Sequence, residues 1–271
     1  MNYLQIEFEI ENAVESEILI ALLSQTGFES FEEADNSLKA FIKEEGFIED
    51  SLEDILKILP VNYAITVIPQ QNWNAQWESS FEPIVVNDFV AIRAGFHQPI
   101  QHVKHEIIIT PKMSFGTGHH ATTYMMIGQM EDLDFKNKTV VDFGTGTGVL
   151  AILAEKMGAD TIDAIDYDEW SIENSMENVA ANNCSRINLI KAETINTRKV
   201  YDIILANINL HVILNNFSVI KSSCKNGTLI LLSGFIKTDE AAMQKALTVN
   251  KVNVLKIIQN GEWICILAEK I

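Results

Sequence analysis

The first seventy residues show two kinds of hydrophobic pattern, the alternation typical of strands and the spacing typical of helices. Apolar and polar residues alternate over 2–10, as in a half-buried strand. Val14, Ile18 and Leu22 then follow at helical spacing, and Gly27 stands where a helix C-cap belongs. The same reasoning predicts two strands, a second helix and a last strand over 28–34, 37–45, 51–59 and 63–70. This β-α-β-β-α-β order is typical of a small ferredoxin-like α+β module.

Farther along the chain, strands and helices alternate with short connections. Two strands lead to a glycine turn and a helix within 112–130. From about residue 137, strands are expected over 139–143, 161–166, 187–192, 201–208 and 227–234, with helices after Gly148 and over 168–182, from Leu210 and over 239–247. This alternation predicts a doubly wound α/β sheet with helices on both faces. Asn260-Gly261 joins two last strands as a hairpin, which fits the sheet order 3-2-1-4-5-7-6.

These patterns divide the 271-residue chain into three parts. We expect an α+β domain over 1–68, a linker over 69–83 that carries Trp73 and Trp77, and a larger domain over 84–271. No window holds the roughly 18 to 20 uncharged apolar residues of a membrane span, and the N-terminus lacks the pattern of an export signal. A soluble, cytoplasmic protein is expected. The three cysteines lie far apart, which suits reduced structural thiols: Cys184, Cys224 and Cys265.

The negative charge of the chain is unevenly spread. Residues 1–60 hold fifteen acids and three bases, so about −12 of the net −17 lies in this segment. Such a field attracts basic partners and repels nucleic acid, so no direct nucleic-acid binding is expected. On charge alone, a solvated acidic face is an equally good interpretation.

The stretch VVDFGTGTGVLAILA, residues 140–154, is a strand, a glycine loop and a helix start. Gly144, Gly146 and Gly148 are spaced G-x-G-x-G, and Val149 stands where a dinucleotide fingerprint has its third glycine. Asp142 would repel a pyrophosphate, but it would favour a ligand that carries an ammonium and a sulfonium group. The loop therefore predicts S-adenosylmethionine rather than a nicotinamide dinucleotide.

Two further polar residues end the strands on either side of the first strand of the predicted sheet. Asp166 follows Gly144 by 22 residues and can accept hydrogen bonds from both ribose hydroxyls of an adenosine. Asn207 ends the fourth strand, where doubly wound folds place their chemistry, and no proline pair or tyrosine follows it to hold a planar nitrogen. An aliphatic amine, positioned by Asn207 with its lone pair toward the methyl group, is the favoured acceptor.

These motifs together resemble one bacterial family. FGTGHHATT at 115–123, the glycine loop, IDYD and LANI are similar to the methyltransferases of protein eleven of the large ribosomal subunit, over nearly the whole chain. The resemblance implies a Rossmann-like methyltransferase domain and an N-terminal domain that recognises a basic ribosomal protein. It also implies methylation of lysine side chains and an N-terminal α-amine. The contacts with S-adenosylmethionine that it implies are Thr123, Gly144, Asp166 and Asn207.

The remaining candidates are two adjacent histidines. His119 and His120 lie on the turn before a predicted helix, and we take His119 as a candidate base or amine-orienting group. The histidines match no compact metal motif, so no metal is expected. Three alternatives stay open: a methyltransferase of another basic protein, an S-adenosylmethionine-binding adaptor without activity, and a nicotinamide-dependent oxidoreductase. Val149 and the terminal hairpin count against the last.

Overall fold

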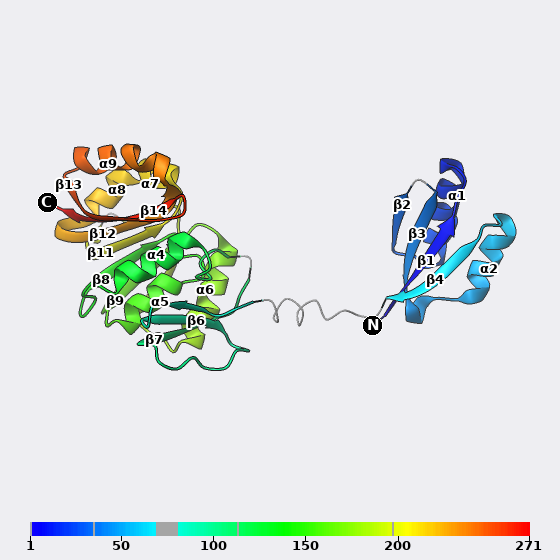
Figure 1. Ribbon diagram of the computed structural model, residues 1–271, viewed down its shortest axis with the longest axis horizontal. Coiled ribbons are helices and arrows are strands. Elements are labelled where there is room, and N and C mark those ends of the chain that lie inside the picture. The colour runs from blue at the N-terminus through cyan, green and yellow to red at the C-terminus, as the bar shows by residue number, and fades with distance from the viewer. Residues whose placement is uncertain (1, 35, 69–80, 113, 197) are drawn as a thin grey trace. The chain divides into compact units, whose positions relative to one another are not determined.

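The computed structural model describes residues 2–34, 36–68, 81–112, 114–196 and 198–271. The chain divides into two compact units, residues 1–80 and 81–271 (Figure 1). Each unit has its own hydrophobic core. Trp73 and Trp77 lie outside the described residues. Phe81 already belongs to the second unit, three residues before the predicted domain start. In the described part of the chain, no helix has the length and apolar character needed to cross a bilayer.

The first unit is a four-stranded antiparallel sheet with two helices on one face. Its elements are β1 (Tyr3–Glu9), α1 (Ala13–Leu23), η1 (Ser24–Thr26), β2 (Ser30–Ala34), β3 (Ser37–Lys43), η2 (Glu44–Gly46), α2 (Glu49–Ile58) and β4 (Tyr63–Ile68). The strand order is β2-β3-β1-β4, as expected for a ferredoxin-like module. Alternate residues of β1 and β3 are buried under the helices, so the period-2 pattern builds one packed face.

Helix α1 forms where the pattern predicts, but its buried face differs from the expected apolar row. Leu19 and Leu23 are fully buried, whereas Val14 is 62% and Ile18 is 40% exposed. The helix is apolar on several sides (AVESEILIALL), so its periodicity alone does not select the core-facing side. Gly27 follows the helix and η1 with φ +94°, the left-handed conformation expected of a C-cap.

The second unit contains the predicted doubly wound sheet. Its elements are β5 (Ile84–Val86), β6 (Val90–Ala94), β7 (His105–Ile109), α4 (Ala121–Met130), β8 (Thr139–Phe143), α5 (Val149–Lys156), β9 (Thr161–Asp166), α6 (Glu169–Ala181), β10 (Ile187–Lys191), β11 (Tyr201–Asn207), α7 (Leu210–Asn215), α8 (Phe217–Ser222), β12 (Cys224–Ile236), η3 (Lys237–Asp239), α9 (Glu240–Val249), β13 (Val252–Asn260) and β14 (Trp263–Lys270). The large sheet runs β10-β9-β8-β11-β12-β14-β13, which is 3-2-1-4-5-7-6 when the strands are numbered from β8. The Asn260-Gly261 turn closes the antiparallel β13–β14 hairpin.

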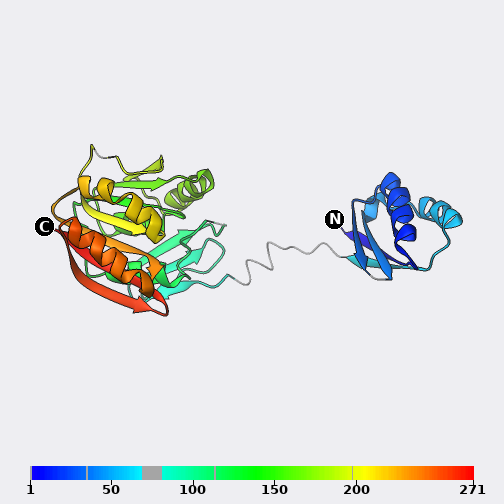
Figure 2. The same ribbon diagram turned by 90° about the horizontal axis from the view of Figure 1, so that it is seen from above.

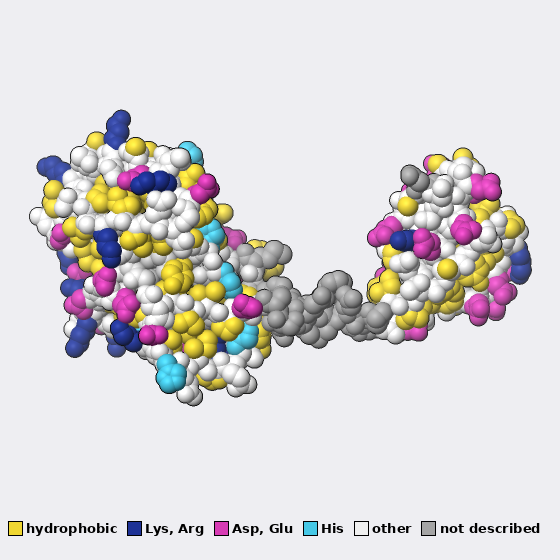
Figure 3. All heavy atoms as spheres, in the orientation of Figure 1, with side chains coloured by type: hydrophobic (Ala, Val, Ile, Leu, Met, Phe, Trp, Pro, Cys, Tyr) yellow, Lys and Arg dark blue, Asp and Glu magenta, His cyan; other side chains and the backbone are white. Residues whose placement is uncertain are grey.

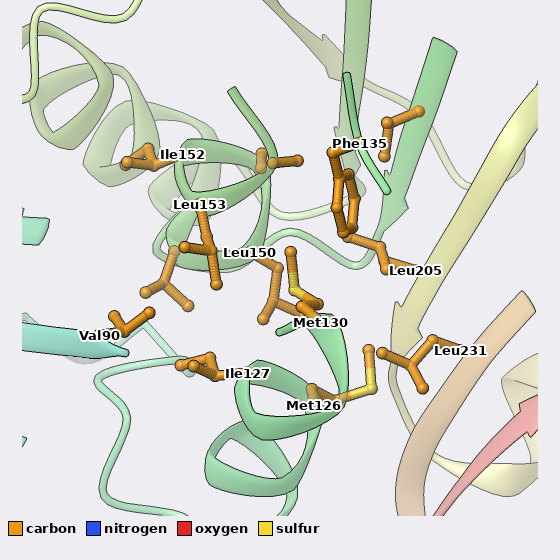
Figure 4. Close-up of a cluster of buried hydrophobic side chains, with 14 of the residues drawn as sticks. Val90, Met126, Ile127, Met130, Phe135, Leu150, Ile152, Leu153, Leu205 and Leu231 are labelled. Carbon is orange, nitrogen blue, oxygen red and sulfur yellow. The ribbon is translucent and has the colours of Figure 1, made fainter. Parts of the chain in front are cut away.

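Helices cover both faces of this sheet (Figures 1 and 2). One core lies among α4, α5 and the small sheet β5–β7, and Figure 4 shows its packing around Met130, Phe135 and Leu150. The other core lies under α7, α8 and α9. All three cysteines are free thiols, and Cys265 is buried in the first of these cores. The arrangement brings the carboxyl ends of β9, β8 and β11 side by side, because these three strands are parallel neighbours.

Candidate active site

The glycine loop connects β8 to α5, and at two of its positions there is no room for a Cβ atom. Gly144 and Gly146 have φ of +81° and +54°. A Cβ at Gly144 would lie 2.1 Å from Ile208 Cγ2, and one at Gly146 would lie 2.3 Å from the Phe115 carbonyl oxygen. Both glycines line a cavity of about 400 Å³. Gly148 is the N-cap of α5 and faces Ser175 rather than the cavity.

A second glycine turn, residues 115–118, is tied to this loop. The Thr147 amide donates to the Phe115 carbonyl over 2.9 Å, and Thr147 Oγ1 donates to the Gly116 carbonyl over 2.7 Å. The two turns belong to FGTGHHATT and to the glycine loop, so these motifs meet in space. Each turn therefore holds the other in position.

Asp142 lies beneath the loop and is not among the residues that line the cavity. Its side chain is buried, and Oδ2 accepts a hydrogen bond of 2.7 Å from Thr145 Oγ1. Burial raises the pKa of this carboxyl to about 7. Oδ1 has no hydrogen-bond partner among the described residues. The carboxyl group thus contacts the buried side of the loop, and not the crevice in which the sequence predicts it.

Asp166 lies at the end of β9 and lines the cavity. Its Oδ2 accepts from the Gly146 amide over 2.9 Å, and its Oδ1 accepts from the Asp168 amide over 3.1 Å. These bonds fix the carboxylate and leave lone pairs for further donors. Tyr167 and Glu193 line the same end of the cavity.

Asn207 ends β11 on the other side of the glycine loop. Its Nδ2 donates to Thr123 Oγ1 over 3.1 Å, while Oδ1 is buried and has no hydrogen-bond partner in the described chain. Asn207 lines the cavity; Thr123 is fully buried on α4 behind it, and the neighbouring Thr122 lines the cavity instead. A buried amide oxygen without a donor is costly, so this position is suited to a ligand N–H.

The two adjacent histidines have different surroundings. His120 lines the cavity, caps α4 through Nδ1, and packs edge-on against Trp263 with ring centroids 4.6 Å apart. His119 contacts Thr117 and the Phe81 ring, and it is not among the lining residues. His119 is the candidate predicted from the sequence, but the structure brings His120 to the cavity.

Several lining residues were not predicted as site residues. Trp263 starts β14 directly after the hairpin turn, opposite Asn260 and Ile236, which brings its ring beside His120. Gly234 lies in β12, and a Cβ there would lie 2.4 Å from the Ile208 carbonyl oxygen. An isolated glycine in an apolar strand signals such a close backbone approach, and this signal could have located it. Within the described residues, no group of three potential metal ligands occurs.

Comparisons with known proteins identify the family of this chain. The model of the family described as ribosomal protein L11 methyltransferase (PrmA) matches residues 5–271. The ribosomal protein L11 methyltransferase of Phocaeicola vulgatus is 36% identical over 249 residues, covering 88% of this chain and 89% of the relative. That of Chlorobaculum parvum is 39% identical over 284 residues, covering 99% and 96%. The crystal structure of a ribosomal protein L11 methylase from Lactobacillus delbrueckii subsp. bulgaricus gives a TM-score of 0.66 at 28% identity, and the match covers 70% of this chain and all of the other.

The match therefore extends over both units and includes the cavity formed by the glycine loop, Asp166 and Asn207. This chain belongs to the ribosomal protein L11 methyltransferase family, whose methyl donor is S-adenosylmethionine.

Proposed function

We propose that this enzyme transfers methyl groups from S-adenosylmethionine to lysine side chains and the N-terminal α-amine of ribosomal protein L11 in the cytoplasm. One observation carries the assignment of the site. A single cavity combines a glycine loop, a strand-end carboxylate fixed by backbone amides, and a buried amide oxygen that accepts no hydrogen bond from the described residues. The first two features suit a nucleoside with a cationic tail, and the third suits an amine.

The residues around the glycine loop fit the cofactor. Because Gly144 and Gly146 lack a Cβ, Ile208 and the Phe115 carbonyl pack directly against the loop, and both glycines still line the cavity. Asp166 can accept the ribose hydroxyls with its remaining lone pairs. S-adenosylmethionine supplies an electrophilic methyl group on a sulfonium. Three residues predicted as cofactor contacts do not line the cavity and act indirectly: Thr123, Asp142 and Gly148. Thr123 anchors Asn207, and the other two shape the glycine loop.

The acceptor amine is placed beside Asn207, and this part of the cavity is the acceptor end. Phe115, Trp263 and Ile208 give the cavity largely apolar walls, which favour the neutral form of an amine. The amine first loses a proton to water. Asn207 Oδ1 then accepts a hydrogen bond from the remaining N–H, so that the lone pair points toward the glycine loop. Bound there, the cofactor would supply the methyl group for a new nitrogen–carbon bond as its sulfur–carbon bond breaks, with the positive charge passing from sulfur to the methylated amine.

The histidine pair provides a test of the acceptor end. We infer that His120, whose ring lies beside Trp263, helps to orient the amine. His120→Asn keeps a residue that can cap α4, so we expect normal folding but a kcat lower by about 10-fold to 100-fold. His119→Asn is the matched control and should leave kcat within about twofold. Equal kcat values for the two variants in steady-state assays would remove His120 from the acceptor site.

The acidic first unit is the proposed recognition unit for the ribosomal protein. Its charge of about −12 over residues 1–60 would attract a basic partner. Its core shares no residue with the cores of the second unit. All residues that line the cavity come after Phe81, so a chain that starts at Phe81 retains the whole cavity. No direct contact with nucleic acid is expected, because the same charge repels phosphates.

Intact-mass measurements test this function. Incubated with S-adenosylmethionine and a mixture of ribosomal proteins, the full chain should add mass in steps of one methyl group to L11, whereas the chain starting at Phe81 should not. Both chains should melt at a higher temperature with S-adenosylhomocysteine than with NAD. No mass gain would favour an adaptor, gain on another basic protein would change the substrate, and a larger shift with NAD would favour an oxidoreductase.

A further inference from the structure

The two edges of the sheet in the first unit differ in chemistry. β2 and β4 are the outermost strands of the order β2-β3-β1-β4. β2 carries Glu32 and Glu33, charges of the kind that protect a sheet edge from pairing with another chain. β4 has the sequence YAITVI, with no charged residue, proline or glycine. Its outer edge pairs with no described strand, so a row of backbone donors and acceptors is left open.

One face of β4 presents an exposed apolar row. Tyr63, Ile65 and Val67 are 40%, 42% and 51% exposed. They are the register partners of Phe8, Ile6 and Leu4, which lie in the core of this unit. The row therefore continues the core face of the sheet outward, beyond the cover of the helices. Figure 3 shows hydrophobic side chains along this part of the unit with acidic side chains beside them.

The other face of β4 opens toward an acid. Ala64 is the register partner of Glu7, and Thr66 is the partner of Gln5. Glu7 makes no ion pair with a described residue, although Lys39 is its register partner on β3, on the side away from β4. A strand added beside β4 would lie two strand spacings, about 10 Å, from β1. Over the small Ala64 and Thr66 side chains, a lysine or arginine of that strand can reach toward Glu7.

We propose that β4 is the docking edge for an extended segment of a basic protein, which adds to the sheet as a fifth strand. Apolar residues on one side of the segment pack along Tyr63, Ile65 and Val67, and cationic residues on the other side face Glu7. Main-chain hydrogen bonds supply affinity, and the alternation of apolar and basic residues supplies specificity. A second copy of this chain is disfavoured as the occupant, because each copy brings about −12 to the contact. The inference rests on the proposed function, since it takes the protein substrate as this partner.

Hydrogen exchange on the full-length enzyme tests strand addition directly and requires no variant. When the ribosomal protein L11 is bound, we expect slower exchange for alternate amides of β4, because those amides point away from β1 and gain an acceptor. Amides of β2 should exchange at the same rate with and without the partner. Protection of β2, or no change in β4 in a complex shown to form, would overturn the proposal.

A pair of double variants tests the apolar row. Ile65→Glu with Val67→Glu should raise the Kd for the ribosomal protein at least tenfold, although the added acids strengthen long-range attraction to a basic partner. Val14→Glu with Ile18→Glu is the matched control, because both residues are exposed apolar side chains on α1 of the same unit. It adds the same two charges, so it should leave the Kd unchanged or slightly lower. Both variants should bind S-adenosylhomocysteine as the wild type does, and equal Kd values for the two variants would contradict the inference.

Two outcomes separate this inference from the proposed function. If the wild-type enzyme neither binds nor methylates the ribosomal protein, the proposed function fails. If it does both while β4 stays unprotected, only the docking edge is wrong. Sedimentation of the free enzyme gives a further check: self-association that the Ile65→Glu and Val67→Glu changes abolish would make a second copy the occupant and would overturn the proposal.

Discussion

Replacing Gly146 with alanine is expected to weaken binding of the cofactor strongly. The residue has φ +54°, and the added Cβ would lie 2.3 Å from the Phe115 carbonyl oxygen. The neighbour is backbone rather than a flexible side chain, so the 115–118 turn has to move away. That movement breaks the 2.9 Å hydrogen bond from the Thr147 amide to the Phe115 carbonyl. In isothermal titration with S-adenosylhomocysteine we expect affinity at least about 100-fold weaker, a loss of about 2.7 kcal/mol.

Gly261→Ala is the matched control for this substitution. Gly261 has φ +60°, close to that of Gly146, but nothing lies within 4 Å of the added Cβ. The variant loses only the left-handed freedom of glycine, about 1 kcal/mol of the free energy of unfolding. Its affinity for S-adenosylhomocysteine should match that of the wild type. Similar affinities for the two variants would show that the close approach to Phe115 does not matter for the cofactor.

Asn207→Ala is expected to slow methyl transfer more than it weakens cofactor binding. The substitution removes the buried Oδ1, which has no partner in the described chain, and the amide that Thr123 holds in place. If that oxygen orients the amine, kcat for the ribosomal protein should fall by about 100-fold to 1,000-fold. Single-turnover assays at saturating S-adenosylmethionine isolate this step, and titration with S-adenosylhomocysteine measures the separate effect on binding.

Asn209 provides the control, because it lines the same cavity two residues farther along. Its Oδ1 is already engaged, since it accepts the Val212 amide over 3.0 Å as the N-cap of α7. Asn209→Ala should therefore lower the free energy of unfolding by about 1 kcal/mol and leave kcat near the wild-type value. A normal kcat for Asn207→Ala would remove Asn207 from amine positioning.

Hydrophobic periodicity was sufficient to predict most of the fold. The strand-helix alternation of the second unit and the Asn260-Gly261 hairpin lie where their local patterns predict them. Asp166 and Asn207 could be expected together because the parallel strands β9 and β11 flank β8, and their carboxyl ends lie at the same edge of the sheet. The buried face of α1 could not be predicted, because apolar residues occur on several of its sides.

The parts of the site that sequence reasoning missed depend on packing between distant segments. Trp263 reaches the cavity because β14 pairs with β12 and brings the ring to His120. Which of His119 and His120 reaches the cavity depends on how the turn before α4 packs. No local sequence pattern predicts this packing. Asp142 has the right residue type at the right strand end, yet its side chain turns under the loop toward Thr145.

Because the two units have separate hydrophobic cores, we expect each unit to unfold in its own thermal transition. The smaller unit buries twelve apolar residues in its core cluster, far fewer than the two clusters of the larger one. Small units bury a smaller fraction of their surface and gain less from folding. Bound cofactor adds stability only to the unit that holds it. On warming, the first unit should therefore unfold before the second, and if the first unit binds the ribosomal protein as proposed, that binding is lost while the second unit still holds the cofactor.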